Sequence, residues 1–251
     1  MKKYQGQLIY SCRDKYGPVE VIEQQQVTRS LHFGNATQQS AMFLYNPIVL
    51  IHKYTQAMLT PLCWLDPKNV LALGLGAASM PKFLLHHFKD IHLDAVELRP
   101  VVIDVAHEYF SLPRNDSRLQ LHTCPANEFI KKTIVSKSYD LVLVDIFITI
   151  KDKDINVDIA DDLEKIYSMV SMDGCLCINL LGTEFNQYKG LPKLMEVFDN
   201  NVYTMPVCES NTILLASRGS VPNEFNQIDF TTLELKYGLP FRQYFDQMKR
   251  L

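Results

Sequence analysis

Between residues 70 and 216, short apolar stretches alternate with segments whose apolar residues recur at helical spacing. Strands are expected at 70–74, 93–97, 119–123, 139–146, 175–180, 202–207 and 212–216, and helices around 80–88, 100–109, 129–134, 158–172 and 191–198. Short buried strands that alternate with amphipathic helices form a parallel sheet covered on both faces. The last two strands have no helix between them, which predicts an antiparallel hairpin at the end of the sheet. This order predicts an α/β, Rossmann-like, seven-stranded fold of the S-adenosylmethionine-dependent methyltransferase type.

The segments on either side of this alternation have different patterns. Val19–Glu23 and Ser30–Gly34 alternate apolar and polar residues, which predicts a small N-terminal antiparallel β unit closed by a helix over Ile48–Leu62. The tail after residue 221 reads as a loop followed by one polar helix. We therefore expect three units, a β unit at 1–55, a nucleoside-binding domain at 56–221 and a tail at 222–251.

Charge and apolar content exclude several classes of partner. The formal net charge is -3, so no overall field attracts nucleic acid or an anionic membrane. No apolar run approaches the ~20 residues that span a bilayer, and the first residues lead into no apolar signal core. The 6 cysteines lie mostly in apolar stretches without metal-ligand spacing, which indicates reduced thiols and no metal site. These features predict a cytoplasmic protein.

A glycine turn and an acidic residue mark a ligand site. Gly74-Leu75-Gly76 follows the first strand of the large sheet, and Glu97 ends the next one. Glycine permits both the turn and a close approach of the backbone to a ligand, and a carboxylate at the following strand end can accept hydrogen bonds from ribose hydroxyls. A nicotinamide dinucleotide site usually has a third glycine where this chain has Ser79. The turn therefore favours an adenosyl ligand of another kind.

Asp145 ends the strand Tyr139–Asp145. Ligands of open parallel sheets bind at the carboxyl ends of the strands, so this carboxylate is expected to face the reacting end of the bound nucleoside. There it can orient an amine or accept its proton.

From about residue 16 to 216 the chain resembles the polyamine aminopropyltransferases, the spermidine synthase family, and especially its compact bacterial members. The resemblance rests on the order and spacing of the segments 31–42, 54–58, 70–79, 96–100 and 139–145.

The resemblance implies roles for individual residues. Asp145 and Tyr54 would hold and activate the attacking amine, and Gln39 would hold the methionine-like tail of the nucleoside. The glycine turn with Glu97 and Leu98 would bind the ribose side, and Ala126 lies in the element that binds adenine. The expected cofactor-binding residues are thus Gln39, Gly74, Leu75, Gly76, Glu97, Leu98 and Ala126.

Three positions depart from the family pattern. Ala77, Pro125 and Ile148 stand where spermidine synthases carry aspartates. The aspartates between residues 152 and 162 are candidates to replace the lost charge of the amine pocket.

Three functions remain open at this point. The resemblance implies aminopropyl transfer from decarboxylated S-adenosylmethionine to a small amine, without a metal, by a protein that forms a homodimer. The second is methyl transfer from S-adenosylmethionine itself, in which Arg99 or backbone amides would neutralise the extra carboxylate. The third is a catalytically silent relative that binds a nucleoside or a protein partner.

Overall fold

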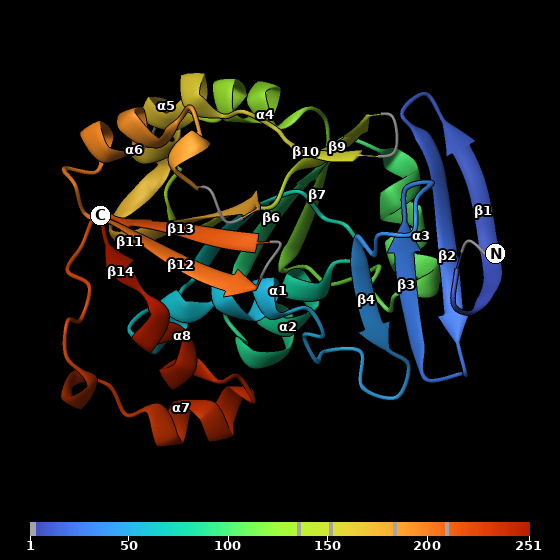
Figure 1. The fold of residues 1–251 in the computed structure, drawn as a ribbon, viewed down its shortest axis with the longest axis horizontal. Helices are drawn as coiled ribbons and strands as arrows, with labels where there is room; N and C mark the ends of the chain where they lie inside the picture. The colour runs from blue at the N-terminus through green and yellow to red at the C-terminus, as the bar shows by residue number, and fades with distance from the viewer. Residues whose placement is uncertain (1–3, 135–136, 151–152, 183–184, 209–210) are drawn as a thin grey trace.

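The N-terminal segment forms a separate antiparallel sheet. The computed structural model describes residues 4–134, 137–150, 153–182, 185–208 and 211–251. The sheet has the order β1-β2-β3-β4. Its strands are β1 (Gln7–Asp14), β2 (Gly17–Gln24), β3 (Thr28–His32) and β4 (Ser40–Phe43). Figure 1 shows this sheet at the opposite end of the molecule from β12 and β14, with α3 against its inner face. The predicted N-terminal β unit is confirmed.

The large sheet has eight strands in the order β14-β12-β13-β11-β8-β5-β6-β7. The strands are β5 (Asn69–Leu73), β6 (His92–Glu97), β7 (Leu119–Thr123), β8 (Tyr139–Val144), β11 (Val170–Leu181), β12 (Val202–Cys208), β13 (Asn211–Ser217) and β14 (Lys249–Arg250). β5, β6, β7, β8 and β11 run parallel, whereas β13 pairs antiparallel with both β11 and β12. The predicted fold is confirmed, and β14 adds an unpredicted eighth strand beside β12.

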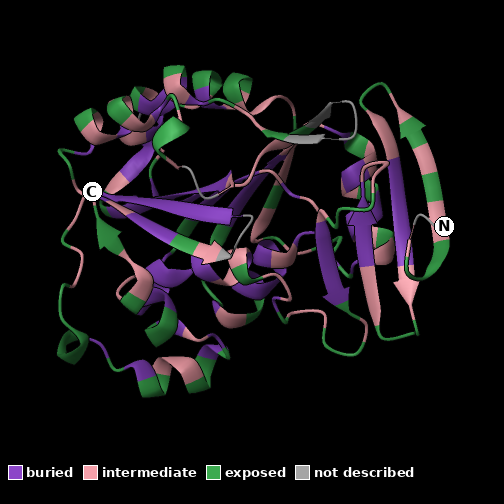
Figure 2. Cartoon of the chain, viewed as in Figure 1, coloured by how far each residue is buried: buried purple, intermediate pink, exposed green. Residues whose placement is uncertain are grey.

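Helices cover both faces of the large sheet (Figure 1). They are α1 (Lys53–Met58), α2 (Ser79–His87), α3 (Pro100–Tyr109), α4 (Ala126–Lys132), α5 (Leu163–Met169), α6 (Leu191–Val197), α7 (Phe230–Tyr237) and α8 (Phe241–Gln247), with 3-10 turns at Thr60–Cys63, Ala160–Asp162, Phe185–Gln187 and Phe225–Gln227. Side chains of α1, α2, α7 and α8 pack in one apolar core, and those of α4, α5 and α6 pack in another. Figure 2 shows the strands between these cores largely buried, whereas β1 at the molecule's edge alternates exposed and half-buried residues.

The structure differs from the expected elements in the segments that flank the strands. The helix expected at Ile48–Leu62 is reduced to α1 and one 3-10 turn. The one expected at 158–172 is reduced to a 3-10 turn and α5, because β11 starts at Val170. Ile134 lies beyond the end of α4 and is 68% exposed, so it is not a packing residue.

Two further elements were not expected. A hairpin of β9 (Phe147–Ile150) and β10 (Lys153–Asn156) follows β8 directly. The C-terminal tail forms two helices instead of one, and Phe241 and Tyr244 of α8 lie fully in the main core. Of the described residues, no helix has the length and apolar content needed to cross a membrane.

Candidate functional site

The glycine turn brings the end of β5 against the residue that ends β8. Gly74 has a φ of +93, and a Cβ on it would lie 2.1 Å from the carbonyl oxygen of Asp145. Its amide donates to the carbonyl of Val96 on β6 at 2.9 Å. Gly76 also has a positive φ, of +53. A residue with a side chain at position 74 would therefore displace the backbone that carries Asp145.

Glu97 lies at the end of β6 and is fixed by this turn. Its Oε2 accepts the backbone N–H of Leu75 at 3.2 Å, and its Oε1 accepts that of Arg99 at 3.0 Å. Burial raises the pKa of Glu97, and the hydrogen bonds from Arg99 and Leu75 oppose that rise. Because a carboxylate oxygen can accept more than one hydrogen bond, Glu97 can still accept ribose hydroxyls.

Tyr54 and Asp145 form a pair where the N-terminal unit meets the large sheet. The Tyr54 hydroxyl donates to the carbonyl oxygen of Gln39 at 3.3 Å, and it also faces the Asp145 carboxylate and interacts with it. Burial raises the pKa of Asp145 to about 6, against the opposing effect of hydrogen bonds from Asn179 and Tyr54. Burial, together with the nearby Asp145 charge, raises the pKa of the Tyr54 phenol well above its usual value. The pair is thus an acid with a perturbed pKa and a phenol that stays protonated.

Leu98 and Ala126 lie at the same edge of the large sheet, whereas Gln39 belongs to the N-terminal unit. Leu98 follows Glu97 and is half-buried, and Ala126 is the first residue of α4, after β7. Gln39 precedes β4, and its backbone N–H donates to Leu31 at 2.9 Å. The turn, Glu97, Ala126 and Asp145 therefore follow the carboxyl ends of β5, β6, β7 and β8, which are neighbours in the sheet.

Arg99 does not face the nucleoside side of this edge, contrary to the role considered for it. Its guanidinium makes two hydrogen bonds to Asp14 of β1, both at 2.9 Å, and a third to the carbonyl of Gly17 at 2.9 Å. It also lies over the ring of Phe33, 4.6 Å from the ring centroid. The residue is buried and ties the N-terminal sheet to β6, so it is not available to neutralise a ligand carboxylate.

Asn179 is a site residue that sequence reasoning missed. It lies on β11, is 3% exposed, and donates from Nδ2 to Oδ1 of Asp145 at 2.9 Å. A signal was present, because Asn179 is the polar residue in the otherwise apolar stretch 175–181 at the carboxyl end of β11, the strand beside β8.

Around the expected amine pocket, the residues that the structure describes supply few charged side chains. Ile148 lies on β9 and is 40% exposed. Asp152, and the side chain of Asp154, lie outside the described residues. Asp158 accepts the backbone N–H of Ala160 at 2.9 Å and is exposed, while Asp162 is buried at the start of α5. Pro125 precedes α4 in an extended conformation.

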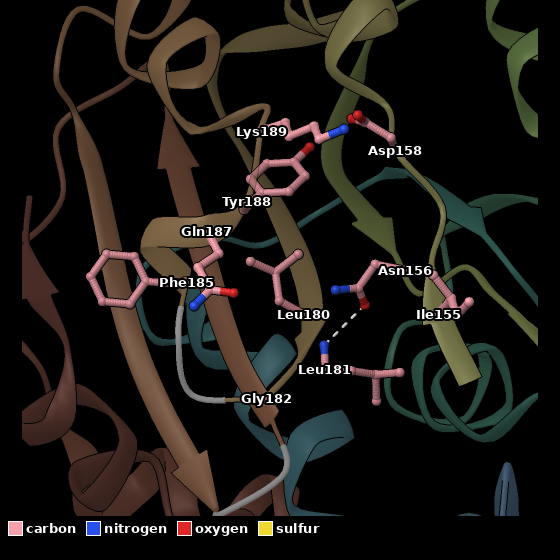
Figure 3. Close-up of a pocket in the computed structure, with 10 residues that line it drawn as sticks. All are labelled: Ile155, Asn156, Asp158, Leu180, Leu181, Gly182, Phe185, Gln187, Tyr188 and Lys189. Atoms are coloured by element: carbon pink, nitrogen blue, oxygen red, sulfur yellow. Dashed lines mark hydrogen bonds between the residues drawn. The ribbon is translucent and has the colours of Figure 1, made fainter. Parts of the chain in front are cut away.

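A cavity of about 660 Å³ opens where β11 ends (Figure 3). Its wall includes Leu180, Leu181 and Ile155, and the side-chain oxygen of Asn156 accepts the N–H of Leu181 at 3.0 Å. Figure 3 shows Asp158 and Lys189 extending toward each other beside the ring of Tyr188. The cavity lies at the carboxyl edge of the strand next to β8.

Among curated proteins, the chain is similar to polyamine aminopropyltransferases. It is 28% identical to the polyamine aminopropyltransferase of Chromobacterium violaceum over 239 residues, which is 92% of this chain and 89% of the relative. A shorter stretch of 124 residues is 27% identical to the mouse eEF1A lysine and N-terminal methyltransferase, covering 46% of this chain and 17% of that protein. No protein-family model matches the chain.

Solved structures show the same fold. A probable spermidine synthase from Corynebacterium glutamicum superimposes with a TM-score of 0.76 at 17% identity, over 92% of this chain and 87% of its own. Human methyltransferase-like protein 13, solved in complex with SAH, gives a TM-score of 0.60 at 21% identity, over 78% of this chain and 93% of its own. The resemblance to the spermidine synthases is thereby confirmed over most of the chain, and the relatives are transferases by name.

Proposed function

We propose that this chain transfers the aminopropyl group of decarboxylated S-adenosylmethionine to a small amine. Such a transfer is a displacement at the carbon next to a sulfonium, and its leaving group is a neutral thioether. The protein therefore needs to align the two reactants and keep the attacking amine unprotonated. The similarity to aminopropyltransferases over 92% of the chain supports this proposal.

The single observation that carries the proposal is the environment of Asp145. The carboxylate is half-buried, it accepts a hydrogen bond from Asn179, and it faces the Tyr54 phenol, so both of these neighbours are neutral groups. With a pKa of about 6, it is mostly ionised near pH 7. A half-buried anion with neutral neighbours is stabilised by an incoming cation. An alkylammonium ion supplies that countercharge, and Asp145 can then accept its proton before the amine attacks.

The nucleoside would occupy the edge beside this pair. In the proposal Glu97 accepts the ribose hydroxyls, the backbone of Gly74–Gly76 passes beneath the ligand, and Leu98 and Ala126 border the adenine. Gln39 would hold the aminopropyl end, next to Tyr54. The chain's own residues thus supply binding and orientation, with no metal in the scheme.

Methyl transfer from S-adenosylmethionine is the second candidate, and the similarity to the mouse eEF1A methyltransferase supports it. That reaction uses a nucleoside with an additional carboxylate. Arg99, the cation nearest to Glu97 in sequence, is committed to Asp14. The geometry thus favours the decarboxylated nucleoside. Calorimetric titration with S-adenosylmethionine, its decarboxylated form and methylthioadenosine compares the two candidates, and tighter binding of S-adenosylmethionine than of the decarboxylated form would favour methyl transfer.

The variant Asp145→Asn tests the role of the carboxylate. Asparagine keeps the size of the side chain and still accepts from Asn179, but it cannot bind a proton or attract an ammonium. We expect turnover to be lost while the affinity for methylthioadenosine changes little. Asp140→Asn is the control, because Asp140 is the second residue of the same strand and accepts the backbone N–H groups of Lys68 and Asn69 at the opposite edge of the sheet. Equal loss of binding and turnover in Asp145→Asn would make Asp145 a structural residue, and nucleoside binding without turnover in the parent would indicate a silent relative.

A further inference from the structure

Two buried asparagines lie in adjacent strands behind Asp145. Asn179 on β11 is 3% exposed, and Asn211, the first residue of β13, is 8% exposed. The inward neighbours of Asn179 on the same face of its strand are Cys175 and Cys177, which belong to the apolar core. The two amides are therefore polar groups in a part of the sheet that is otherwise apolar.

The amides form a directed chain of hydrogen bonds. Nδ2 of Asn211 donates to Oδ1 of Asn179 at 2.9 Å, and Nδ2 of Asn179 donates to Oδ1 of Asp145 at 2.9 Å. Because Asn211 occupies the amide oxygen of Asn179, the amide nitrogen of Asn179 has to face the carboxylate. The reverse orientation would place two acceptor oxygens together at Asp145 and two donors together at Asn211.

Strand pairing does not require these side chains. The backbones of β11 and β13 are already paired in continuous register from Cys175–Ser217 to Leu181–Asn211. A buried amide costs free energy unless it is hydrogen bonded, and an apolar side chain would fill either position without that cost. This chain of hydrogen bonds ends at Asp145. Its effect on the ionisation and orientation of that carboxylate therefore explains best why both amides are present.

We propose that Asn179 and Asn211 are positioning residues that keep Asp145 ionised and correctly oriented toward the amine acceptor. Asn179 acts directly on the carboxylate, and Asn211 acts through Asn179 by fixing the direction of its amide. The catalytic part of this inference rests on the proposed function, whereas the effect on Asp145 itself does not.

The groups around Asp145 determine how its pKa should change when the Asn179 amide is removed. Tyr54 of α1 is the titratable group that faces it, Asn179 of β11 is the neutral donor, and burial is the largest influence on its pKa. Hydrogen bonds to a carboxylate favour its ionised form. Removing the Asn179 amide leaves burial opposed by Tyr54 alone, so the carboxyl should hold its proton to a higher pH.

Infrared difference spectroscopy of the substrate-free protein measures this directly. The carbonyl stretch of protonated Asp145 is followed against pH, with Asp145→Asn as the reference that lacks it. We expect Asn179→Leu to raise the titration midpoint by about one pH unit or more, the scale for loss of one hydrogen bond to a charged group. Asn211→Leu should raise it by less, because the amide of Asn179 remains, and this variant also serves if Asn179→Leu does not fold.

Asn201→Leu is the matched control. Asn201 is an asparagine directly before β12, and its amide donates to the carbonyls of Ser217 and Gly219 at 2.8 Å, so none of its described hydrogen bonds involves Asp145. The titration midpoint of Asp145 in Asn201→Leu should equal that in the parent. An unchanged midpoint in both Asn179→Leu and Asn211→Leu, or an equal rise in Asn201→Leu, would overturn the proposal.

Measurements of turnover distinguish a failure of this proposal from a failure of the proposed function. If the parent transfers an aminopropyl group, the acid limb of its kcat/KM profile should move upward in Asn179→Leu by the same interval as the infrared midpoint. If the parent transfers none, the proposed function fails while the infrared shift still decides what the two asparagines do to Asp145.

Discussion

Glu97 and Asp145 follow strands on either side of β5, and their surroundings suit them to different roles. The oxygens of Glu97 accept the backbone N–H groups of Leu75 in the turn and of Arg99, which fixes the side chain in one place. Asp145 is held instead by the side chains of Asn179 and Tyr54, which come from other elements. Two carboxylates in different environments can divide binding and proton transfer between them. Glu97 is suited to hold a ligand, and Asp145 to exchange a proton with one.

Glu97→Ala should weaken the binding of methylthioadenosine by about 1.5–3 kcal/mol, the range for hydrogen bonds to a charged group. Isothermal titration calorimetry measures the change. Glu128→Ala is a suitable control, because Glu128 is an exposed residue of α4 that pairs with Lys132. Parent-like affinity in Glu97→Ala would show that the nucleoside does not bind at the end of β6.

Lys82 should make the free energy of unfolding increase with pH. It is 4% exposed, its Nζ donates to the carbonyl of Phe110, and burial lowers its pKa to about 7. The folded state therefore releases the proton near pH 7, whereas an unfolded lysine keeps it until about pH 10.4. Because the unfolded state binds more protons in this interval, the free energy of unfolding increases from about pH 7 upward, by at most about 2 kcal/mol between pH 7 and 9.

Lys82→Met removes this contribution. Chemical denaturation at pH 7 and pH 9 should show a smaller gain for Lys82→Met than for the parent, while the exposed Lys132→Met keeps the parent's gain. An identical pH response in Lys82→Met and the parent would mean that Lys82 is protonated in the folded protein throughout this range.

Among the elements, the turn after β5 determines where both carboxylates lie. Gly74→Ala should be much more damaging than the same substitution at Gly238, although both glycines have positive φ values, of +93 and +66. At Gly238 no described atom lies within 4 Å of the added Cβ, so only the backbone strain of about 1–2 kcal/mol applies. At Gly74 the Cβ meets the Asp145 carbonyl, so the backbone has to move.

Thermal unfolding and nucleoside titration together check this prediction. Gly74→Ala should lose more stability than Gly238→Ala and should also lose nucleoside affinity, which Gly238→Ala retains. Similar losses of stability with intact affinity in both variants would contradict the close approach of the turn to Asp145.

The elements that sequence reasoning predicted best are the central strands, whose apolar runs are bounded by polar or glycine residues. β5, for example, was expected at residues 70–74 and occurs at Asn69–Leu73. The C-terminal tail was predicted less well because Phe241 and Tyr244 are separated by polar residues, and only the tertiary structure shows that their helix α8 packs against β12 and the 3-10 turn Thr60–Cys63. β14 is only two residues long, too short for a strand pattern.

The site was partly predictable for a related reason. The glycine turn, Glu97 and Asp145 are set by their positions at strand ends, which the sequence pattern locates. The partners of Arg99 and Asn179 depend on long-range packing, since Asp14 is separated from Arg99 by 85 residues and Asp145 from Asn179 by 34.

In the whole molecule, the N-terminal sheet and the large sheet meet at the candidate site. Arg99 joins the two through Asp14, and Tyr54 reaches both the Gln39 carbonyl and Asp145. The acceptor would therefore bind between the two units, beside the hairpin that carries Ile148. Ile148 stands at a position where the resemblance to spermidine synthases implies an aspartate. In the proposed function we therefore expect putrescine to be a poor substrate with a high KM, since a partly desolvated second ammonium without a partner is costly.

Ile148→Asp should improve kcat/KM for putrescine. Ile148 is 40% exposed, so solvent screening limits the gain to roughly two- to fivefold, the range of an exposed ion pair. Met172→Asp is the control, because Met172 is an exposed residue of β11 far before its carboxyl end. Efficient spermidine formation by the unmodified protein would show that other carboxylates supply the charge.

The most direct test of the account is the release of methylthioadenosine from decarboxylated S-adenosylmethionine in the presence of a panel of small amines, followed by mass spectrometry. The account predicts amine-dependent release, a product amine heavier by one aminopropyl group, and loss of both in Asp145→Asn. No release with any amine, together with formation of S-adenosylhomocysteine from S-adenosylmethionine, would contradict aminopropyl transfer and identify the chain as a methyltransferase.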